Sequence, residues 1–84
     1  MIIANAEQLG ALLRRARTDK GMTQAELASV AHVSRQWVIA AEAGAPTARL
    51  DLVLDVLRVV GLVVDVVPDE PDDAIDTILS RARG

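Results

Sequence analysis

Residues 21–44 read GMTQAELASVAHVSRQWVIAAEAG, and the helix signals inside this stretch decide how the chain folds. Thr23 and Glu26 have the spacing of a capping box, which predicts that a helix begins at Thr23. Ser34 is a preferred residue for starting a helix and Gly44 for ending one, so a second helix is predicted between them. The stretch therefore predicts two short helices that are joined by a tight turn.

Two short helices joined by a turn of three to four residues are typical of a helix-turn-helix, whose second helix enters the DNA major groove. The N-terminal residues of that helix lie at the base edges, and here they are Arg35 and Gln36. Arginine is the commonest reader of guanine, and glutamine pairs with adenine through two hydrogen bonds. Gln24 begins the preceding helix, where free backbone amides favour phosphate. These three residues are therefore candidate DNA contacts.

Two further helices and a strand are predicted around this pair. Asn5 favours the start of a first helix, which carries an apolar stripe at helical spacing and ends at Gly21. A fourth helix, from about residue 48 to residue 60, is apolar on most of its faces, which implies that a partner chain covers part of it. Residues 62–67 read LVVDVV, a β-branched run that predicts a short strand. A lone strand leaves backbone groups unpaired, so we expect this one to pair with its copy in a second subunit.

The negative charge of the chain is concentrated in its last residues. The 84 residues carry a net charge of −3. Residues 1–60 contain seven Lys and Arg against six Asp and Glu, which gives +1, whereas residues 61–84 contain two against six, which gives −4. DNA binding depends on local rather than total charge, so a DNA partner is compatible with this balance. We divide the chain into a DNA-binding and dimerisation domain, residues 1–67, and an acidic tail, residues 68–84, that favours a short helix. The apolar stripe of this helix is expected either to pack on the dimer or to dock on a toxin.

Several functions are disfavoured by residue types and patterns that the sequence lacks. It has no cysteine and a single histidine, so we expect neither a disulfide nor a metal site. It has no Gly-rich phosphate loop and no Ser-His-Asp pattern, so we expect no catalysis and no cofactor. The most apolar segment, residues 56–67, contains Arg58 and Asp65 and is too short to span a membrane. The first residues lack the pattern of a signal peptide, so a cytoplasmic protein is expected.

The stretch of residues 21–44 resembles the Cro/repressor-type (XRE-type) helix-turn-helix family, with its Gly-x-Thr-Gln-x-x-Leu-Ala start and its Glu-x-Gly finish. The similarity extends over residues 9–60 and implies a mostly α, lambda-repressor-like domain of four to five helices. The continuation, an apolar helix followed by Gly-Leu and a short valine strand, is similar to HipB-like antitoxins. That second resemblance implies a C-terminal β-strand that pairs across a dimer, formed by Leu62, Val63, Val64, Val66 and Val67.

The first resemblance also implies roles for single residues. Positions that contact DNA in the family are matched by Thr23, Gln24, Ser34, Arg35 and Gln36. Arg17 and Glu42 match positions that form a structural salt bridge. Ile39 and Ala40 stand where the family usually has polar readers, and Ile39 is expected at a thymine methyl group. Trp37, the only aromatic residue, is expected to be half-buried near the DNA backbone, on the exposed side of its helix.

The leading interpretation is a transcriptional repressor that binds double-stranded DNA at a palindromic operator as a homodimer. The similarity to HipB-like antitoxins implies in addition that the protein sequesters a toxin and autoregulates the operon of the toxin–antitoxin pair. Two alternatives stay open: a free-standing XRE-type repressor without a toxin, and a protein-interaction module that has lost DNA readout. Ile39 and Ala40 make the last alternative conceivable, because their side chains cannot hydrogen-bond to bases.

Overall fold

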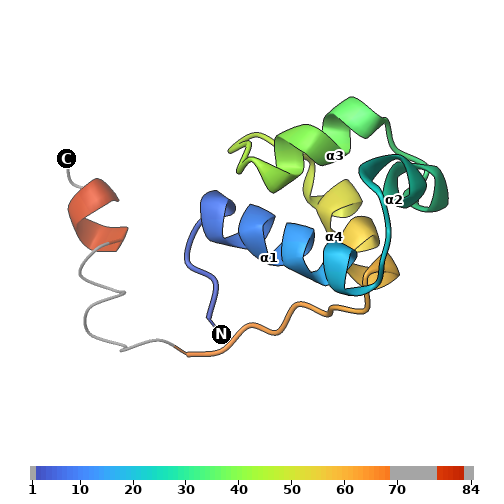
Figure 1. Ribbon diagram of the computed structural model, residues 1–84. Helices are drawn as coiled ribbons and strands as arrows, with labels where there is room; N and C mark the ends of the chain where they lie inside the picture. The colour runs from blue at the N-terminus through green and yellow to red at the C-terminus, as the bar shows by residue number, and fades with distance from the viewer. Residues whose placement is uncertain (1, 69–77, 83–84) are drawn as a thin grey trace.

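The computed structural model describes residues 2–68 and 78–82 of the chain, and their regular structure is helical throughout (Figure 1). The helices are α1 (Ala6–Asp19), α2 (Gln24–Ala31), α3 (Arg35–Glu42) and α4 (Leu50–Val59). Residues 78–82 are helical as well. α2 packs on both α3 and α4, and α3 packs on α1. The prediction of a mostly helical domain with four to five helices is confirmed.

The first three helices begin where their capping residues predict. The side chain of Asn5 accepts a hydrogen bond from the backbone N–H of Gln8 at 2.8 Å, which fixes the start of α1. Thr23 and Glu26 form the predicted capping box, with hydrogen bonds of 3.1 and 3.0 Å in the two directions. The hydroxyl of Ser34 accepts a hydrogen bond from a backbone N–H in the first turn of α3 at 3.0 Å. Each cap satisfies a backbone donor that has no partner inside its helix.

Glycines end α3 and α4. Gly44 and Gly61 have φ values of +88° and +83°, in the left-handed region that glycine adopts without strain. Beyond Gly61, the N–H of Leu62 donates to the carbonyl of Leu57 at 2.8 Å and closes the last turn of α4. The side chain of Leu62 is half-buried against the core. This residue of the expected dimer strand therefore contributes to the fold of its own chain.

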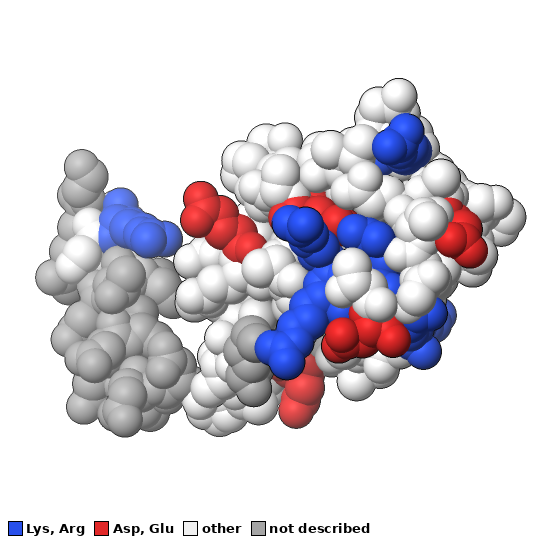
Figure 2. Space-filling view, viewed as in Figure 1, with Lys and Arg blue, Asp and Glu red and all other residues white. Residues whose placement is uncertain are grey.

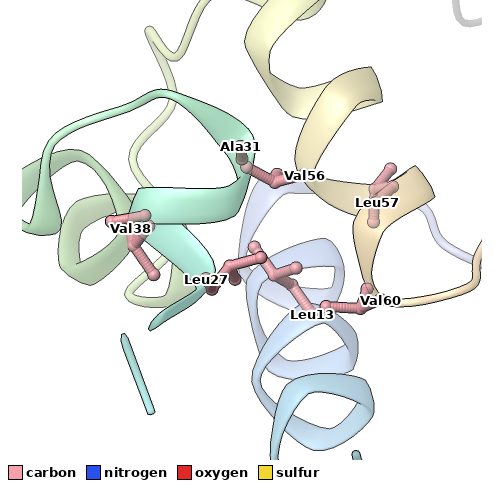
Figure 3. Close-up of a cluster of buried hydrophobic side chains, with 8 residues drawn as sticks. Leu13, Leu27, Ala31, Val38, Val56, Leu57 and Val60 are labelled. Carbon is pink, nitrogen blue, oxygen red and sulfur yellow. The ribbon is translucent and has the colours of Figure 1, made fainter. Parts of the chain in front are cut away.

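One cluster of apolar side chains joins the four helices (Figure 3). In Figure 3, Leu13 of α1 lies between Leu27 of α2 and Val60 at the end of α4, and Ala31 points toward Val56. The buried members are Leu13, Leu27, Ala28, Ala31, Val38, Val56, Leu57 and Val60. Because every helix contributes to the cluster, it fixes the position of each helix through one of its sides.

α1 and α3 approach each other closely at Gly10. A Cβ atom at this position would lie 2.5 Å from the carbonyl oxygen of Ala41 and 2.7 Å from that of Glu42. Backbone carbonyls cannot swing aside as the end of a flexible side chain can, so any larger residue forces the two helices apart. The sequence does not predict this contact, because a glycine inside a helix does not reveal which other helix packs against it.

α4 buries only one of its sides. Val56 and Leu57 are 0% and 3% exposed, whereas Leu50 and Leu54 are 70% and 38% exposed. A single chain thus leaves part of this apolar helix uncovered, as its sequence predicts. In the described part of the chain, no helix is both long and apolar enough to cross a membrane.

The strand predicted at residues 62–67 is absent from the structure. Residues 2–68 and 78–82 contain no β-strand, and this segment leaves α4 as an irregular chain that passes below α1 in Figure 1. A strand needs a neighbour for its N–H and C=O groups, and no other segment of the described chain supplies one. The predicted tail helix is seen in part, since residues 78–82 are helical and residues 69–77 lie outside the described residues.

We expect Gly10→Ala to destabilise the protein by about 1–2 kcal/mol, because overpacking against two backbone carbonyls outweighs the higher helix propensity of alanine. Thermal and urea unfolding followed by circular dichroism measure this change. Ala11→Gly, at an exposed position of the same helix, isolates the propensity difference with the opposite sign. A Gly10→Ala variant that melts at or above the wild-type temperature would contradict the close approach of α1 and α3.

Candidate nucleic-acid interface

α2 and α3 are joined by a turn at His32 and Val33. His32 has a φ of 58°, in the left-handed region that histidine tolerates better than most residues. The N–H of Val33 donates to the carbonyl of Ala28 at 3.0 Å, and the Val33 side chain packs against the core. The turn thus ends α2 sharply and leads directly into the N-terminus of α3 beside it (Figure 1).

α3 has a buried side and an outward face. Val38 is fully buried, while the exposed residues of the helix and its C-cap are Arg35, Gln36, Ile39, Ala40 and Ala43. We call these residues the outward face of α3. Its N-terminal half offers two hydrogen-bonding side chains, and its C-terminal half offers only aliphatic ones. Exposed polar residues in the first turn of the second helix are what a helix-turn-helix uses to reach base edges.

The outward face carries little charge. α3 contains one basic residue, Arg35, and one acidic residue, Glu42. In Figure 2, Lys and Arg groups gather over the C-terminal half of α1, whereas the edge formed by α3 is white apart from one basic group. In residues 2–68 and 78–82, no three His, Asp or Glu side chains lie close enough together to hold a metal ion. Because it holds a single cation, the outward face is suited to recognition by hydrogen bonds and apolar contacts.

A buried ion pair holds the inner side of α3. Arg17 of α1 donates from Nε to Glu42 Oε2 at 2.6 Å and from Nη2 to Glu42 Oε1 at 3.0 Å. The two side chains are only 9% and 4% exposed. Arg17 Nη1 donates to the carbonyl of Met22 at 2.7 Å, just before α2, and Gln24 Nε2 donates to Glu42 Oε1 at 3.3 Å. The structure thus brings together the two residues expected to pair and adds Gln24 to them.

The hydrogen bond from Arg17 to Glu42 also shifts the pKa of Arg17. It raises the pKa of Arg17 above its ordinary value, although burial by itself would lower it. The guanidinium of Arg17 is protonated at every pH at which proteins fold, as arginine is in general, so it always offers its N–H groups as donors. The carboxylate of Glu42 in turn orients Gln24 at the start of α2. A glutamine amide carries two hydrogens, and Glu42 takes one, so the other remains for a ligand at the surface.

Thr23 and Ser34, both expected to contact DNA, serve as helix caps. The pKa of Glu26 lies below its ordinary value, because its carboxylate is hydrogen-bonded to the backbone N–H of Thr23 and, with a smaller effect, to the Thr23 side chain. Thr23 and Ser34 are exposed, at the N-termini of α2 and α3. The positive end of each helix dipole lies there, so capping leaves both residues where a phosphate would be stabilised.

Trp37 is half-buried, as expected, but it packs toward the core and does not lie on the exposed side of α3. Its ring lines a small apolar cavity together with Leu9 of α1 and Val53 of α4. Helical spacing explains this position, because Trp37 precedes Val38 by one residue and Ala41 by four, and both of these face the core. Trp37 therefore belongs to the packing of α3 and not to its outward face.

Ala43 is the member of the outward face that was not singled out from the sequence. It follows Gln36 by seven residues and Ile39 by four, so helical periodicity was the available signal. The alanine side chain carries no polar group, so residue type alone does not indicate a DNA contact. Its exposure at the C-cap shows that the aliphatic surface continues to the end of α3.

The valines expected to form a dimer make up a second surface. Val63, Val64, Val66 and Val67 are 88%, 57%, 90% and 52% exposed. They follow α4, and in the view of Figure 1 their segment lies on the opposite side of α1 from α3. The structure therefore does not bring them together with the candidate DNA contacts.

The chain is similar to proteins that carry a helix-turn-helix. A family described as a helix-turn-helix domain matches residues 8–69. An uncharacterized HTH-type transcriptional regulator of Sinorhizobium fredii, y4mF, is 39% identical over 64 residues, which cover 76% of this chain and 84% of the relative.

Two solved structures share the fold of the chain. A HipB variant in complex with the O2 20mer has a TM-score of 0.77 at 21% identity, over 83% of this chain and 97% of that chain. HipB in complex with the O4 20mer has a TM-score of 0.77 at 20% identity, over 83% of this chain and 99% of that chain. The HipB fold is therefore present here with little sequence identity.

We expect Glu42→Ala to lower the free energy of unfolding by about 3–5 kcal/mol, because it leaves the buried charge of Arg17 without its partner. Urea unfolding measures the loss. Asp51→Ala is the matched control, since the Arg49–Asp51 pair has the same N–O distance of 2.6 Å but side chains that are 72% and 60% exposed. This control should lose little stability, because solvent screens an exposed pair. Equal losses in the two variants would show that burial does not set the strength of the Arg17–Glu42 pair.

Proposed function

Because the chain belongs to the helix-turn-helix family of transcriptional regulators, we propose that it is a DNA-binding repressor whose dimer binds the two halves of a palindromic operator. One observation carries the proposal. Arg35 and Gln36 are exposed at the N-terminus of α3, while the inner side of the same helix is locked by Glu42. A rigid helix with readers on its free side fits the major groove.

The contacts that we propose divide into base reading and phosphate binding. Arg35 reads guanine, and Gln36 reads adenine, each through a pair of hydrogen bonds. Gln24 binds phosphate with the amide hydrogen that Glu42 leaves free, and Thr23 and Ser34 lie beside the backbone amides of their helix N-termini. Phosphate contacts position the protein on the duplex, and base contacts select the site.

We propose that two copies associate through the segment after α4. Its four valines are more than half exposed in the single chain, and an apolar surface of this kind marks an interaction site. Antiparallel pairing of residues 62–67 with the same residues of a second copy would give each segment a partner along one backbone edge. The exposed Leu50 and Leu54 of α4 provide further apolar surface for the same contact.

We further propose that the protein is the antitoxin of a toxin–antitoxin pair and that its acidic tail binds the toxin. The sequence resemblance to HipB-like antitoxins and the likeness to the HipB fold support this role. Ile78 and Leu79 are 65% and 43% exposed, so they are free to dock into a groove of a partner. The charge of −4 over residues 61–84 suits a basic toxin surface.

A free-standing repressor without a toxin is the second candidate. The Sinorhizobium relative is described as a transcriptional regulator, which favours this simpler role. The identity of the neighbouring gene distinguishes the two candidates, because an antitoxin is encoded beside its toxin.

We expect Arg35→Ala to weaken binding to the cognate operator by about 1–3 kcal/mol and to relax the preference at one base position. Fluorescence anisotropy with the DNA upstream of the gene and with a scrambled duplex, at several salt concentrations, measures both effects. Gln24→Ala is the comparison, since loss of a phosphate contact should weaken binding evenly on both duplexes. Equal losses on the two duplexes for Arg35→Ala would assign Arg35 to phosphate. No binding by the wild type would favour an interaction module that has lost DNA readout.

We expect the wild type to sediment as a dimer at micromolar concentration and Val64→Asp to sediment as a monomer, because a charge in the shared strand opposes its burial. Val30→Asp is the matched control, since Val30 and Val64 are both 57% exposed but Val30 lies on α2. Sedimentation velocity separates the two states. A monomeric wild type would refute the proposed dimer.

We expect deletion of residues 68–84 to leave operator affinity within about threefold and to abolish capture of the toxin. The tail follows the valine segment, which lies away from α3, so its acids should not approach the DNA. Co-purification with the protein encoded next to the chain measures capture, and anisotropy measures operator affinity. A truncated protein that gains tenfold in DNA affinity would place the tail near the operator instead.

A further inference from the structure

We propose that the C-terminal half of the outward face of α3 reads thymine through its C5 methyl group. The residues that form this half are Ile39, Ala40 and Ala43, which we call the aliphatic patch. The inference rests on the proposed function of DNA binding and deepens it, because it names the base that each half-site presents to the patch.

The aliphatic patch is exposed although nothing in the fold requires it to be apolar. Ile39 is 42% exposed, and Ala40 and Ala43 are exposed as well. The core takes the other side of α3, where Val38 is fully buried. The patch is therefore available to a ligand, and it continues the same helix face that carries Gln36.

Of the four bases, thymine exposes the group in the major groove that best matches the aliphatic patch. Thymine alone presents a methyl group there, next to one acceptor, whereas guanine, adenine and cytosine are distinguished by their hydrogen-bond donors and acceptors. An aliphatic side chain against a donor or acceptor would remove water without replacing its hydrogen bond, which costs free energy. Against a thymine methyl the same side chain buries apolar surface on both partners.

Helix geometry places the thymine near the bases that the polar half of the face reads. Ile39 and Ala40 follow Gln36 by three and four residues, which is about 4.5–6 Å along the helix axis at 1.5 Å per residue. Base pairs are stacked about 3.4 Å apart, so the patch lies roughly one to two base pairs from the base that Gln36 contacts. Ala43 extends the patch by about one more base pair.

The test begins with a random DNA library, from which the full chain selects the duplexes that it binds. The consensus duplex is then synthesised with thymine or with uracil in its half-sites. Uracil keeps the hydrogen-bonding edge of thymine and lacks only the methyl group. A third duplex carries uracil outside the half-sites and controls for the substitution itself.

We expect uracil in one half-site to weaken binding about fourfold and uracil in both to weaken it about 15-fold, which is the effect of burying one methyl group in each half. Ile39→Ala should lower the ratio of the affinity for the thymine duplex to that for the uracil duplex, because the shorter side chain covers less of the methyl group. Val30→Ala is the matched control, since it shortens an exposed aliphatic side chain on α2 and should leave the ratio unchanged.

The outcomes separate this inference from the proposed function. Equal affinity for the thymine and uracil duplexes would overturn the thymine readout while DNA binding stands. An affinity ratio that Ile39→Ala leaves unchanged would overturn the assignment of the thymine readout to Ile39, the largest side chain of the aliphatic patch. A library from which no sequence is enriched would overturn sequence-specific DNA binding itself, and the thymine readout with it.

Discussion

The buried ion pair between Arg17 and Glu42 is the constraint on which the DNA-binding half of the molecule depends. The carboxylate of Glu42 accepts hydrogen bonds from Arg17 of α1 and Gln24 of α2, while it belongs to α3 itself. Arg17 also binds the carbonyl of Met22 in the connection between α1 and α2. Neither charge can lose its partner without leaving an uncompensated charge in the interior. Three helices are thereby held in one arrangement by a few directional bonds.

This arrangement sorts the residues of α3 by side. The inner side holds Val38 in the core and Glu42 in the ion pair, and Gly10 lets α1 come close to the helix backbone. Trp37 fills the space toward α1 and α4. The outward face consists of the residues of α3 and its C-cap that take no part in this packing. The fold therefore does not dictate which residues stand on this face, and this is the physical basis for proposing that they contact DNA.

The single chain leaves two apolar surfaces uncovered on elements that follow one another. Leu50 and Leu54 are exposed on α4, and the valines after α4 are exposed as well. A domain this small buries only a modest fraction of its surface, so its core can compensate for little exposed apolar surface. Association of two copies would cover these surfaces and, in the proposed repressor, set the spacing of the two copies of α3. Stability and DNA recognition would then depend on the same contact.

The sequence by itself determined the helices and identified most of the residues that are exposed at the candidate site. Capping residues such as Thr23 and Ser34 and the stop at Gly61 act through hydrogen bonds and backbone angles within a few residues, so they can be read locally. Helical periodicity predicted most of the exposed residues of α3. The positions of Trp37 and Ala43 became clear only from the structure.

Tertiary structure alone decided the features that join distant parts of the chain. The close approach at Gly10 and the bond from Gln24 to Glu42 depend on how helices pack, and no local pattern specifies that packing. The segment of residues 62–67 shows the converse, because its β-branched residues favour a strand that the described chain does not form. Strand formation needs backbone partners on a neighbouring chain segment, and propensity cannot supply them.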